Sequence, residues 1–377
     1  MKIEKVEPFI LSYDLDECFY FSQWEYKKRT ICLVKVTTDD GNYGWGEGYG
    51  PANLVKAGIE FFSPYLLNQD PQHHERLWRT MFLRSFDFAR RGVLLSALSA
   101  IDVALWDLKG KLWNQPISIL LGGRKREIVK AYATGMYFSD GMDLAKKMAK
   151  EAVSYKKDGF NAMKMKVGLG VKKDIENVKA VREAIGPDIQ LMIDANHAYS
   201  LKEAVQLALA IEKHDIAWFE EPLSPENYDC YAELRTKTII PIASGECEYL
   251  SAGFLNLFQK RSVDIAQPDI CAAGGITEIK KIAALAELFG VEMLLHTWGS
   301  GISIAAALQV LANLDIIPGR LHEPELLLEL DRTVNPLRDG LIIPQYKLKD
   351  GTIRIPNSPG LGVDIDEKMF KKYLVEK

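Results

Sequence analysis

Three short apolar runs, each ending in a carboxylate, recur at a fixed interval in the middle of the chain. The runs lead into Asp194, Glu220 and Glu246, and each carboxylate follows the previous one by 26 positions. That interval holds one strand, one helix and two loops, so the three carboxylates are predicted to end three successive strands of one parallel barrel or sheet. Carboxylate oxygens that meet at one edge bind a hard cation, usually Mg²⁺. The pattern therefore predicts a Mg²⁺ site.

An alternative interpretation is that each carboxylate caps the helix that follows it, as βα loops commonly require. Ser200 and Glu203 already supply a capping box after Asp194, so this helix has another cap. Three carboxylates in phase, each directly after an apolar strand, favour the metal site.

Length and composition limit the class of protein. The chain has 377 residues, of which 47% are hydrophobic, so it can form one large domain and a smaller one. Lysine and arginine total 47, aspartate and glutamate 51, and no basic block is present, so nothing indicates a nucleic-acid partner. The five scattered cysteines suit a reducing compartment, and we interpret them as structural. No signal peptide or membrane span is evident, so we expect a soluble, cytoplasmic protein without a membrane partner.

The first third of the chain, residues 1–125, is predicted to form an α+β capping domain. Strand patterns cover residues 2–11, 30–37 and 43–47, and helical patterns cover 53–66, 71–82 and 92–112. Residues 14–29 are predicted to form an aromatic-rich loop between the first two strands. We expect this loop to be a lid over the site, in which Tyr20 and Trp24 contact the substrate.

Beyond Gly122 and Gly123 the chain alternates short apolar strands with amphipathic helices. Strands are predicted near residues 130–136, 161–166, 189–194, 216–220, 239–244, 263–267, 291–296 and 316–323. Eight strands with seven helices between them predict an α/β fold, a modified TIM barrel of the (β/α)7β type, over residues 126–325. Residues 326–377 are expected to return to the capping domain.

Two lysines end the second predicted barrel strand. Lys164 and Lys166 are two positions apart, so both side chains point into the barrel. Their mutual repulsion is expected to lower the pKa of one lysine toward the range of a base. The alternative, two solvated lysines at a strand end, becomes less favoured once the metal ligands are considered.

The last three strands each end in a further polar residue: Asp269, His296 and Glu323. The spacings are again regular, 27 positions in both cases. Asp269 and His296 lie on neighbouring strands, so the carboxylate could bond one ring nitrogen and raise the basicity of the imidazole. Four other histidines fit surface or satisfied positions, whereas His197, next to Asn196, stays open.

These residues resemble a known family. The ordered motifs Lys-Met-Lys, Asp-Ala-Asn, Phe-Glu-Glu-Pro, Ser-Gly-Glu, Gln-Pro-Asp, His-Thr-Trp and His-Glu-Pro are similar to those of the mandelate racemase subgroup of the enolase superfamily, over nearly the whole chain. The resemblance implies Mg²⁺ on Asp194, Glu220 and Glu246, with Lys166 and the His296/Asp269 dyad as acid/base groups on opposite faces of the substrate. It also implies that Lys164 and Glu323 hold the substrate carboxylate and that Asn196 contacts the α-hydroxyl.

The resemblance implies an enzyme that removes a proton α to a carboxylate. Most members of the subgroup are similar to acid-sugar dehydratases, and the motifs Tyr-Phe-Ser-Gln-Trp and Tyr-Gly-Trp-Gly-Glu-Gly-Tyr-Gly resemble those of archaeal arabinonate or gluconate dehydratases. We therefore expect a homo-oligomeric, Mg²⁺-dependent dehydratase that converts an aldonate such as arabinonate, gluconate or galactonate into a 2-keto-3-deoxy acid. A racemase or epimerase of a 2-hydroxy acid is the alternative. A Schiff-base aldolase would leave the three carboxylates unexplained, and a binding protein would not need seven in-phase polar strand ends.

Overall fold

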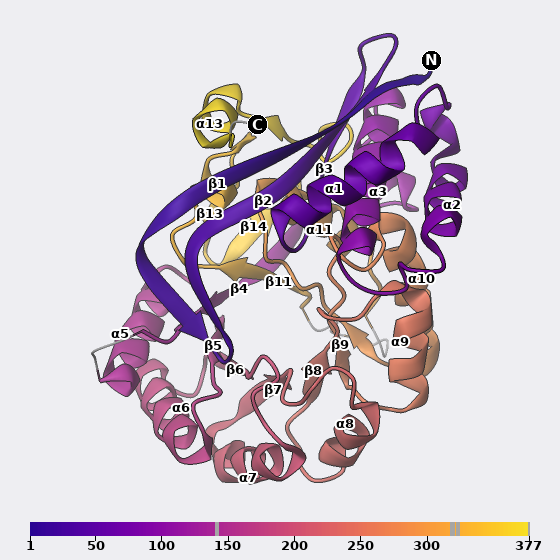
Figure 1. Ribbon diagram of the computed structural model, residues 1–377. Helices are drawn as coiled ribbons and strands as arrows, with labels where there is room; N and C mark the ends of the chain where they lie inside the picture. The colour runs from indigo at the N-terminus through magenta and orange to yellow at the C-terminus, as the bar shows by residue number, and fades with distance from the viewer. Residues whose placement is uncertain (140–142, 317–320, 322–324, 376–377) are drawn as a thin grey trace.

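The structure, a computed structural model, describes residues 1–139, 143–316, 321 and 325–375. Its larger part is a closed parallel barrel (Figure 1). The barrel strands are β4 (Ile128–Gly135), β5 (Ala162–Lys166), β6 (Gln190–Asp194), β7 (Ile216–Glu220), β8 (Ile242–Ser244), β9 (Ile265–Ala266), β10 (Glu292–Met293) and β11 (Leu327–Asp331).

Parallel pairing closes these strands into a ring. Each strand from β4 to β9 pairs with the next one in the chain, and β11 pairs with β4. A bridge between Leu295 and Leu328 completes the circle. Because the covering helices bury the strands from outside and the barrel interior is packed, β5 and β11 are buried along their whole length.

Seven main helices connect the eight strands. They are α5 (Leu144–Lys157), α6 (Val171–Ile185), α7 (Leu201–Ile211), α8 (Tyr228–Arg235), α9 (Leu250–Gln259), α10 (Gly275–Phe289) and α11 (Gly301–Leu311), with the short helix η3 (Glu212–His214) after α7. The predicted (β/α)7β barrel is confirmed. Ser200 also caps α7 through the expected capping box with Glu203.

The eighth strand lies later in the chain than predicted. It is β11, at Leu327–Asp331, instead of residues 316–323, so the barrel extends past residue 325. The connection after α11 is longer than the regular spacing of the earlier units suggested. The predicted site residue Glu323 lies outside the described residues.

The capping part contains an antiparallel sheet and three helices. The sheet is formed by β1 (Ile3–Phe21), β2 (Trp24–Thr38) and β3 (Tyr43–Gly48). The helices are α1 (Ala52–Phe62), α2 (His74–Ser85) and α3 (Val93–Leu112), with short turns η1 (Ser63–Tyr65) and η2 (Pro71–His73), and α4 (Ile117–Leu120) leads to the barrel.

The predicted loop at residues 14–29 is instead a β-hairpin. β1 and β2 stay paired past Asp14, through Phe19 and Tyr26 to Phe21 and Trp24, with one irregularity between Asp14 and Phe19. The aromatic residues that suggested a lid are also strand formers, which explains the extension. Figure 1 shows the hairpin (indigo) sweeping from the capping part to the barrel beside β5.

The C-terminal segment returns to the capping part. It contains α12 (Pro336–Asp339), β12 (Ile342–Ile343), β13 (Leu348–Lys349), β14 (Thr352–Arg354), β15 (Asp364–Ile365) and α13 (Glu367–Tyr373). The ring of Phe370 packs edge-on to Phe9 at 5.2 Å, and the Val375 N–H donates to the Ile10 carbonyl at 2.9 Å. β14 also extends the sheet beside β4.

A buried glutamate joins the capping part to the barrel. Glu47, on β3, accepts hydrogen bonds from the backbone N–H groups of Ser300 and Ser303 and from the Ser300 hydroxyl, at the start of α11. Burial raises the pKa of Glu47 to about 7, although these hydrogen bonds oppose the shift.

Within the described residues, no helix is long and apolar enough to cross a membrane.

Candidate active site

Three carboxylates meet at the C-terminal end of the barrel. Asp194 and Glu220 end β6 and β7, and Glu246 lies two residues after β8. One oxygen from each lies within 4.8 Å of the others. The donor set is all oxygen and anionic, which fits Mg²⁺. The structure therefore brings together the three residues whose spacing predicted a metal site.

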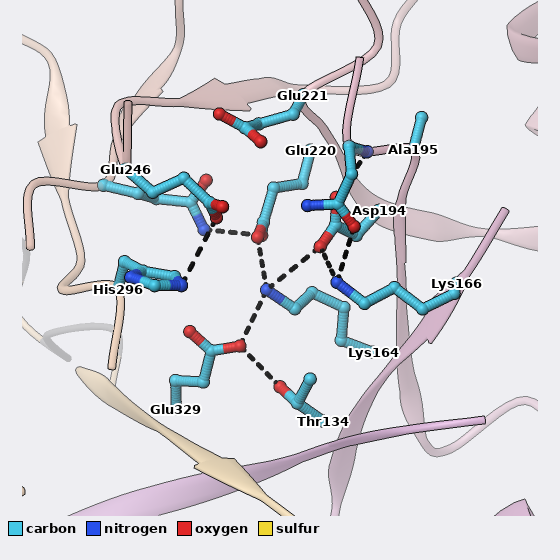
Figure 2. Close-up of polar contacts among 12 residues, drawn as sticks. Thr134, Lys164, Lys166, Asp194, Ala195, Glu220, Glu221, Glu246, His296 and Glu329 are labelled. Atoms are coloured by element: carbon cyan, nitrogen blue, oxygen red, sulfur yellow. Dashed lines mark hydrogen bonds and ion pairs between the residues drawn. The ribbon is translucent and has the colours of Figure 1, made fainter. Parts of the chain in front are cut away.

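Neighbouring side chains fix the orientation of these carboxylates (Figure 2). The Oε2 atom of Glu220 accepts hydrogen bonds from Gln267 Nε2 at 2.6 Å and Trp218 Nε1 at 3.0 Å. Its Oε1 atom pairs with Lys164 Nζ. Burial raises the pKa of Glu220 to about 7, although Lys164 opposes the shift.

Both lysines of β5 point into the barrel, as predicted. Lys164 Nζ lies 2.8 Å from Glu329 Oε1 and 3.8 Å from Asp194 Oδ2, and Lys166 Nζ lies 2.5 Å from Asp194 Oδ2 and 2.8 Å from Asn196 Oδ1. Burial raises the pKa of Asp194, but the two ammonium groups outweigh it and hold the pKa at about 2.

The expected lowering of a lysine pKa is wrong for this arrangement. Burial lowers the pKa of Lys166, and the Lys164 ammonium lowers it further, but attraction to Asp194 and Glu246 outweighs both and raises it. The prediction counted the two lysines and underestimated the surrounding negative charge. A cation bound by the carboxylates would reduce that attraction.

His296 lies on the other side of the cluster from Lys166 (Figure 2). Its Nδ1 atom is 2.7 Å from Asp269 Oδ2, and its Nε2 atom is 3.4 Å from Glu246 Oε2. Burial lowers the pKa of His296, but Glu246 and the hydrogen bond with Asp269 outweigh burial and raise the pKa to about 10. The structure thus forms the predicted His296/Asp269 pair.

Glu329, which the sequence analysis missed, lies on the eighth strand of the barrel, six residues after the predicted Glu323. It is on β11, and its Oε1 atom accepts a hydrogen bond from Thr134 Oγ1 at 2.7 Å in addition to its contact with Lys164. Its Oε2 atom accepts from the Thr297 N–H at 3.1 Å. Burial raises its pKa, but Lys164, His296 and the hydrogen bonds to the carboxylate together outweigh burial and hold the pKa at about 2. The apolar run of Leu326, Leu327 and Leu328 before it was the available signal.

The cavity at this site is small, with a volume of about 30 Å³. Five of the lining side chains are aromatic, and most of the others carry charge. The lining residues are Phe21, Tyr26, Tyr49, Tyr137, Lys164, Lys166, Asp194, Asn196, Glu246, His296, Trp298 and Glu329.

The hairpin does reach the site, but with different residues from those predicted. Phe21 and Tyr26 line the cavity, whereas Tyr20 and Trp24 are not among the lining residues and the Trp24 side chain is 65% exposed. Strand alternation explains the difference for Tyr20, because Tyr20 and Phe21 face opposite sides of β1. It does not explain Trp24, which pairs with Phe21 across the two strands. Tyr137 was also missed; among the described residues its buried hydroxyl has no hydrogen-bond partner.

Several contacts hold the hairpin tip on the barrel. Tyr20 and Phe138 exchange backbone hydrogen bonds of 3.0 and 2.9 Å. The Gln23 amide donates to the Asn196 carbonyl at 2.6 Å, and Ser22 donates to the Ala195 carbonyl. Buried Arg29 pairs with Asp331 and lies 3.9 Å from the centroid of a Trp298 ring.

Comparison with known families agrees with this architecture. Residues 147–369 match the enolase C-terminal domain-like family, and residues 16–122 match the N-terminal domain of the mandelate racemase / muconate lactonizing enzyme family. The chain belongs to the enolase superfamily, as an enzyme of the mandelate racemase type.

Its relatives include two kinds of sugar-acid enzyme. It is 43% identical to the D-galactarolactone cycloisomerase of Agrobacterium fabrum, over 99% of both chains. It is 37% identical to the arabinonate dehydratase of Saccharolobus solfataricus, over 91% of this chain and 90% of the relative. The crystal structure of the 3,6-anhydro-D-galactonate cycloisomerase from Zobellia galactanivorans superposes with a TM-score of 0.91 at 53% identity, over the whole of both chains.

A further structural neighbour bears on the metal. A racemase from Streptomyces coelicolor, solved with bound magnesium, is 27% identical and superposes with a TM-score of 0.89, over 99% of this chain and the whole of that chain. The three carboxylates here form an acidic group of the kind that binds such an ion.

Proposed function

We propose that this enzyme removes the α-proton of a sugar acid and eliminates the oxygen at the β-carbon, to give a 2-keto-3-deoxy acid. The observation that carries the proposal is the placement of Lys166 and His296 on opposite sides of the three-carboxylate cluster. A substrate held between them presents each face of its α-carbon to one proton-transfer group.

The substrate carboxylate would lie against Lys164, with Glu329 beside it in the role expected for Glu323. Removing the α-proton places a second negative charge on the carboxylate oxygens, so stabilising that charge is the main catalytic requirement. Lys164 carries a fixed positive charge in a buried position. Mg²⁺ on Asp194, Glu220 and Glu246 would add Lewis-acid stabilisation of the same oxygens. Asn196, hydrogen-bonded to Lys166, is placed to contact the α-hydroxyl.

The second half of the reaction breaks the bond between the β-carbon and its oxygen. The electrons of the former C–H bond form the C=C bond of an enol, and the departing oxygen takes a proton, for which the imidazolium of His296 is placed. The enol then tautomerises to the keto acid. If the departing oxygen is a free hydroxyl, water is lost; if it belongs to a ring, the ring opens and the product is an isomer of the substrate.

We propose ring opening, a cycloisomerisation, as the activity, with loss of water as the second candidate. The two relatives at 43% and 53% identity are cycloisomerases by name, and they align over almost the whole chain. The character of the lining also favours a compact ring over an extended, fully hydroxylated chain, because five of the lining residues are aromatic and can pack on C–H faces. Racemisation, the third candidate, needs no departing oxygen.

A substrate comparison tests the proposal. The protein, supplied with Mg²⁺, would be incubated separately with 3,6-anhydro-D-galactonate, D-galactarolactone, D-arabinonate, D-galactonate and D-gluconate. Mass spectrometry and NMR would follow the product. We expect a keto acid of unchanged mass from one of the cyclic acids. A product lighter by one water, formed only from the open-chain acids, would favour the dehydratase, and inversion without a keto product would favour the racemase.

A further inference from the structure

Behind the carboxylate cluster, a second group of side chains converges. His197 lies in the loop after Asp194, Cys247 follows Glu246 directly, and Glu221 follows Glu220 directly. One ligand atom from each of His197, Glu221 and Cys247 lies within 4.8 Å of the others. The proposed reaction uses none of the three.

The separations within this group fit a tetrahedral metal site. Nε2 of His197 is 3.0 Å from Oε2 of Glu221 and 3.6 Å from Sγ of Cys247. Tetrahedral zinc with its usual bond lengths places nitrogen and oxygen ligands roughly 3.3 Å apart and nitrogen and sulfur ligands roughly 3.6 Å apart. Only small side-chain adjustments would be needed.

The second ring nitrogen of His197 is held as it is in metal-binding histidines. Nδ1 lies 3.1 Å from the carbonyl oxygen of Leu223, which can only accept a hydrogen bond. Nδ1 therefore carries the proton of the neutral ring, and Nε2 directs its lone pair toward Glu221. A hydrogen bond from the distal nitrogen to a backbone carbonyl is the usual support of a metal-ligating imidazole.

Glu221 supplies an independent reason to expect a ligand. Its side chain is fully buried, and neither carboxylate oxygen accepts a hydrogen bond from the described residues. In the part of the chain that the structure describes, its one ion-pair contact is with Nε2 of His197, at 3.0 Å, and a buried carboxylate costs on the order of several kcal/mol unless a cation or a proton compensates its charge. The backbones of Glu221 and His197 have φ values of +42° and +67°. Such left-handed conformations are unfavourable for these residue types and concentrate at functional sites.

We propose that His197, Glu221 and Cys247 bind a thiophilic divalent cation, of the Zn²⁺ or Co²⁺ class, beside the carboxylate site. Sulfur and imidazole ligands select such metals, whereas Mg²⁺ prefers oxygen ligands alone. On binding, the cation takes the thiolate of Cys247, whose proton passes to solvent. The two sites therefore hold different metals, and Glu221 and Glu220 couple them through one peptide bond.

Cobalt spectroscopy tests the proposal without reference to catalysis. The full-length protein would be saturated with Mg²⁺ and titrated with Co²⁺. We expect one Co²⁺ per chain that excess Mg²⁺ does not displace, with thiolate-to-cobalt charge-transfer absorption in the near ultraviolet. Cys247→Ser should abolish this absorption, and His197→Gln should weaken Co²⁺ binding by at least about tenfold. The control Cys230→Ser, in a partly exposed cysteine, should change neither.

Two results would overturn the site. One is the absence of thiolate absorption in a protein that still binds Mg²⁺, which would mean that a proton, and no metal, lies between His197 and Glu221. The other is absorption that survives in Cys247→Ser. Thermal unfolding of each variant shows whether it is folded. Because the test measures an absorption spectrum and not activity, its outcome does not depend on whether the proposed reaction is correct.

Discussion

The barrel rim and the β1–β2 hairpin meet at one cavity but are built in opposite ways. At the rim, most of the charged groups are buried and held by several partners: Glu220 alone contacts Lys164, Trp218 and Gln267. The hairpin presents aromatic side chains and rests on the barrel mainly through its tip and Arg29. A rigid polar rim suits a reaction that requires fixed charges, and an apolar wall on a separate element can change its fit without disturbing them.

The largest expected effect is at the rim. Glu220→Gln should lower kcat/KM by about a thousandfold or more, because it removes one anionic ligand and leaves Lys164 without its closest partner. Steady-state kinetics over a range of Mg²⁺ concentrations would measure the loss. The control is Glu226→Gln, six residues later on a 73% exposed side chain, which should be unaffected. Normal activity of Glu220→Gln, or of the wild type in EDTA, would contradict the metal assignment.

A smaller loss is expected when a positioning residue of the rim is changed. Asp269→Asn keeps the size of the side chain but removes the charge that faces Nδ1 of His296 at 2.7 Å. Turnover should fall by roughly 10- to 100-fold, because the imidazole stays present but is less well oriented. The pKa of His296 should also fall from its raised value of about 10. NMR titration of the ring would measure this pKa. An unchanged pKa of His296 would show that Asp269 does not support the imidazole.

Changes in the hairpin should affect substrate fit and leave metal binding intact. Phe21→Ala and Tyr26→Ala each remove an aromatic face from the cavity wall, so KM should rise by about threefold to tenfold with kcat less affected. Trp24→Ala is the matched control, because its side chain is 65% exposed and does not line the cavity. Equal effects in all three variants would mean that the hairpin contributes only packing; a loss confined to Trp24→Ala would restore the original expectation for that residue.

Glu47, which joins the capping part to the barrel, should affect the pH dependence of the free energy of unfolding and not the reaction. The pKa of Glu47 is raised from 4.5 to about 7 in the folded protein, so between these pH values the folded state binds the proton more tightly than the unfolded state. The resulting stabilisation is complete below pH 4.5 and is lost as the pH rises through 7. At about 1.4 kcal/mol per pKa unit, the loss approaches about 3 kcal/mol.

Glu47→Gln removes this titration. Urea unfolding of the wild type and the variant at several pH values should show the wild type losing stability relative to the variant as the pH rises from 5 to 8. The exposed Glu60→Gln should follow the wild type throughout. Parallel curves for the wild type and Glu47→Gln would show that Glu47 ionises normally in the fold.

The rim was far more predictable from sequence than the hairpin. Asp194, Glu220 and Glu246 follow apolar strands at a constant spacing, and that regularity reports a repeating βα unit directly. The same regularity gave a wrong position for the eighth strand, because the segment between α11 and β11 is longer than the earlier connections. The strand was predicted too early in the chain, and Glu329 was therefore overlooked.

In the hairpin, the aromatic content indicated contact with the site but not which face. Only the folded structure shows that Phe21 and Tyr26 line the cavity while Trp24, which pairs with Phe21 next to the turn, is exposed. The contacts of His197, Glu221 and Cys247 were also invisible in the sequence, because they depend on where three loops bend after their strands. The sequence predicted the kinds of charged residue that meet at the rim. It did not predict how their charges balance, and the pKa of Lys166 is raised where a lowered value was expected.

Exchange of the α-proton with solvent tests the central claim most directly. The wild type, Lys166→Ala and His296→Asn would be incubated in D₂O with Mg²⁺ and the acid that the wild type converts, and NMR would follow deuterium at the α-carbon alongside product formation. If Lys166 is the base, His296→Asn should lose product formation yet still exchange the α-proton, and Lys166→Ala should lose both. If the substrate presents the proton to His296 instead, the pattern is reversed for exchange. Exchange that survives in only one of the two variants shows which group, and so which face of the α-carbon, takes the proton; only the first pattern supports proton transfer on two separate faces. Full turnover by both variants would contradict it.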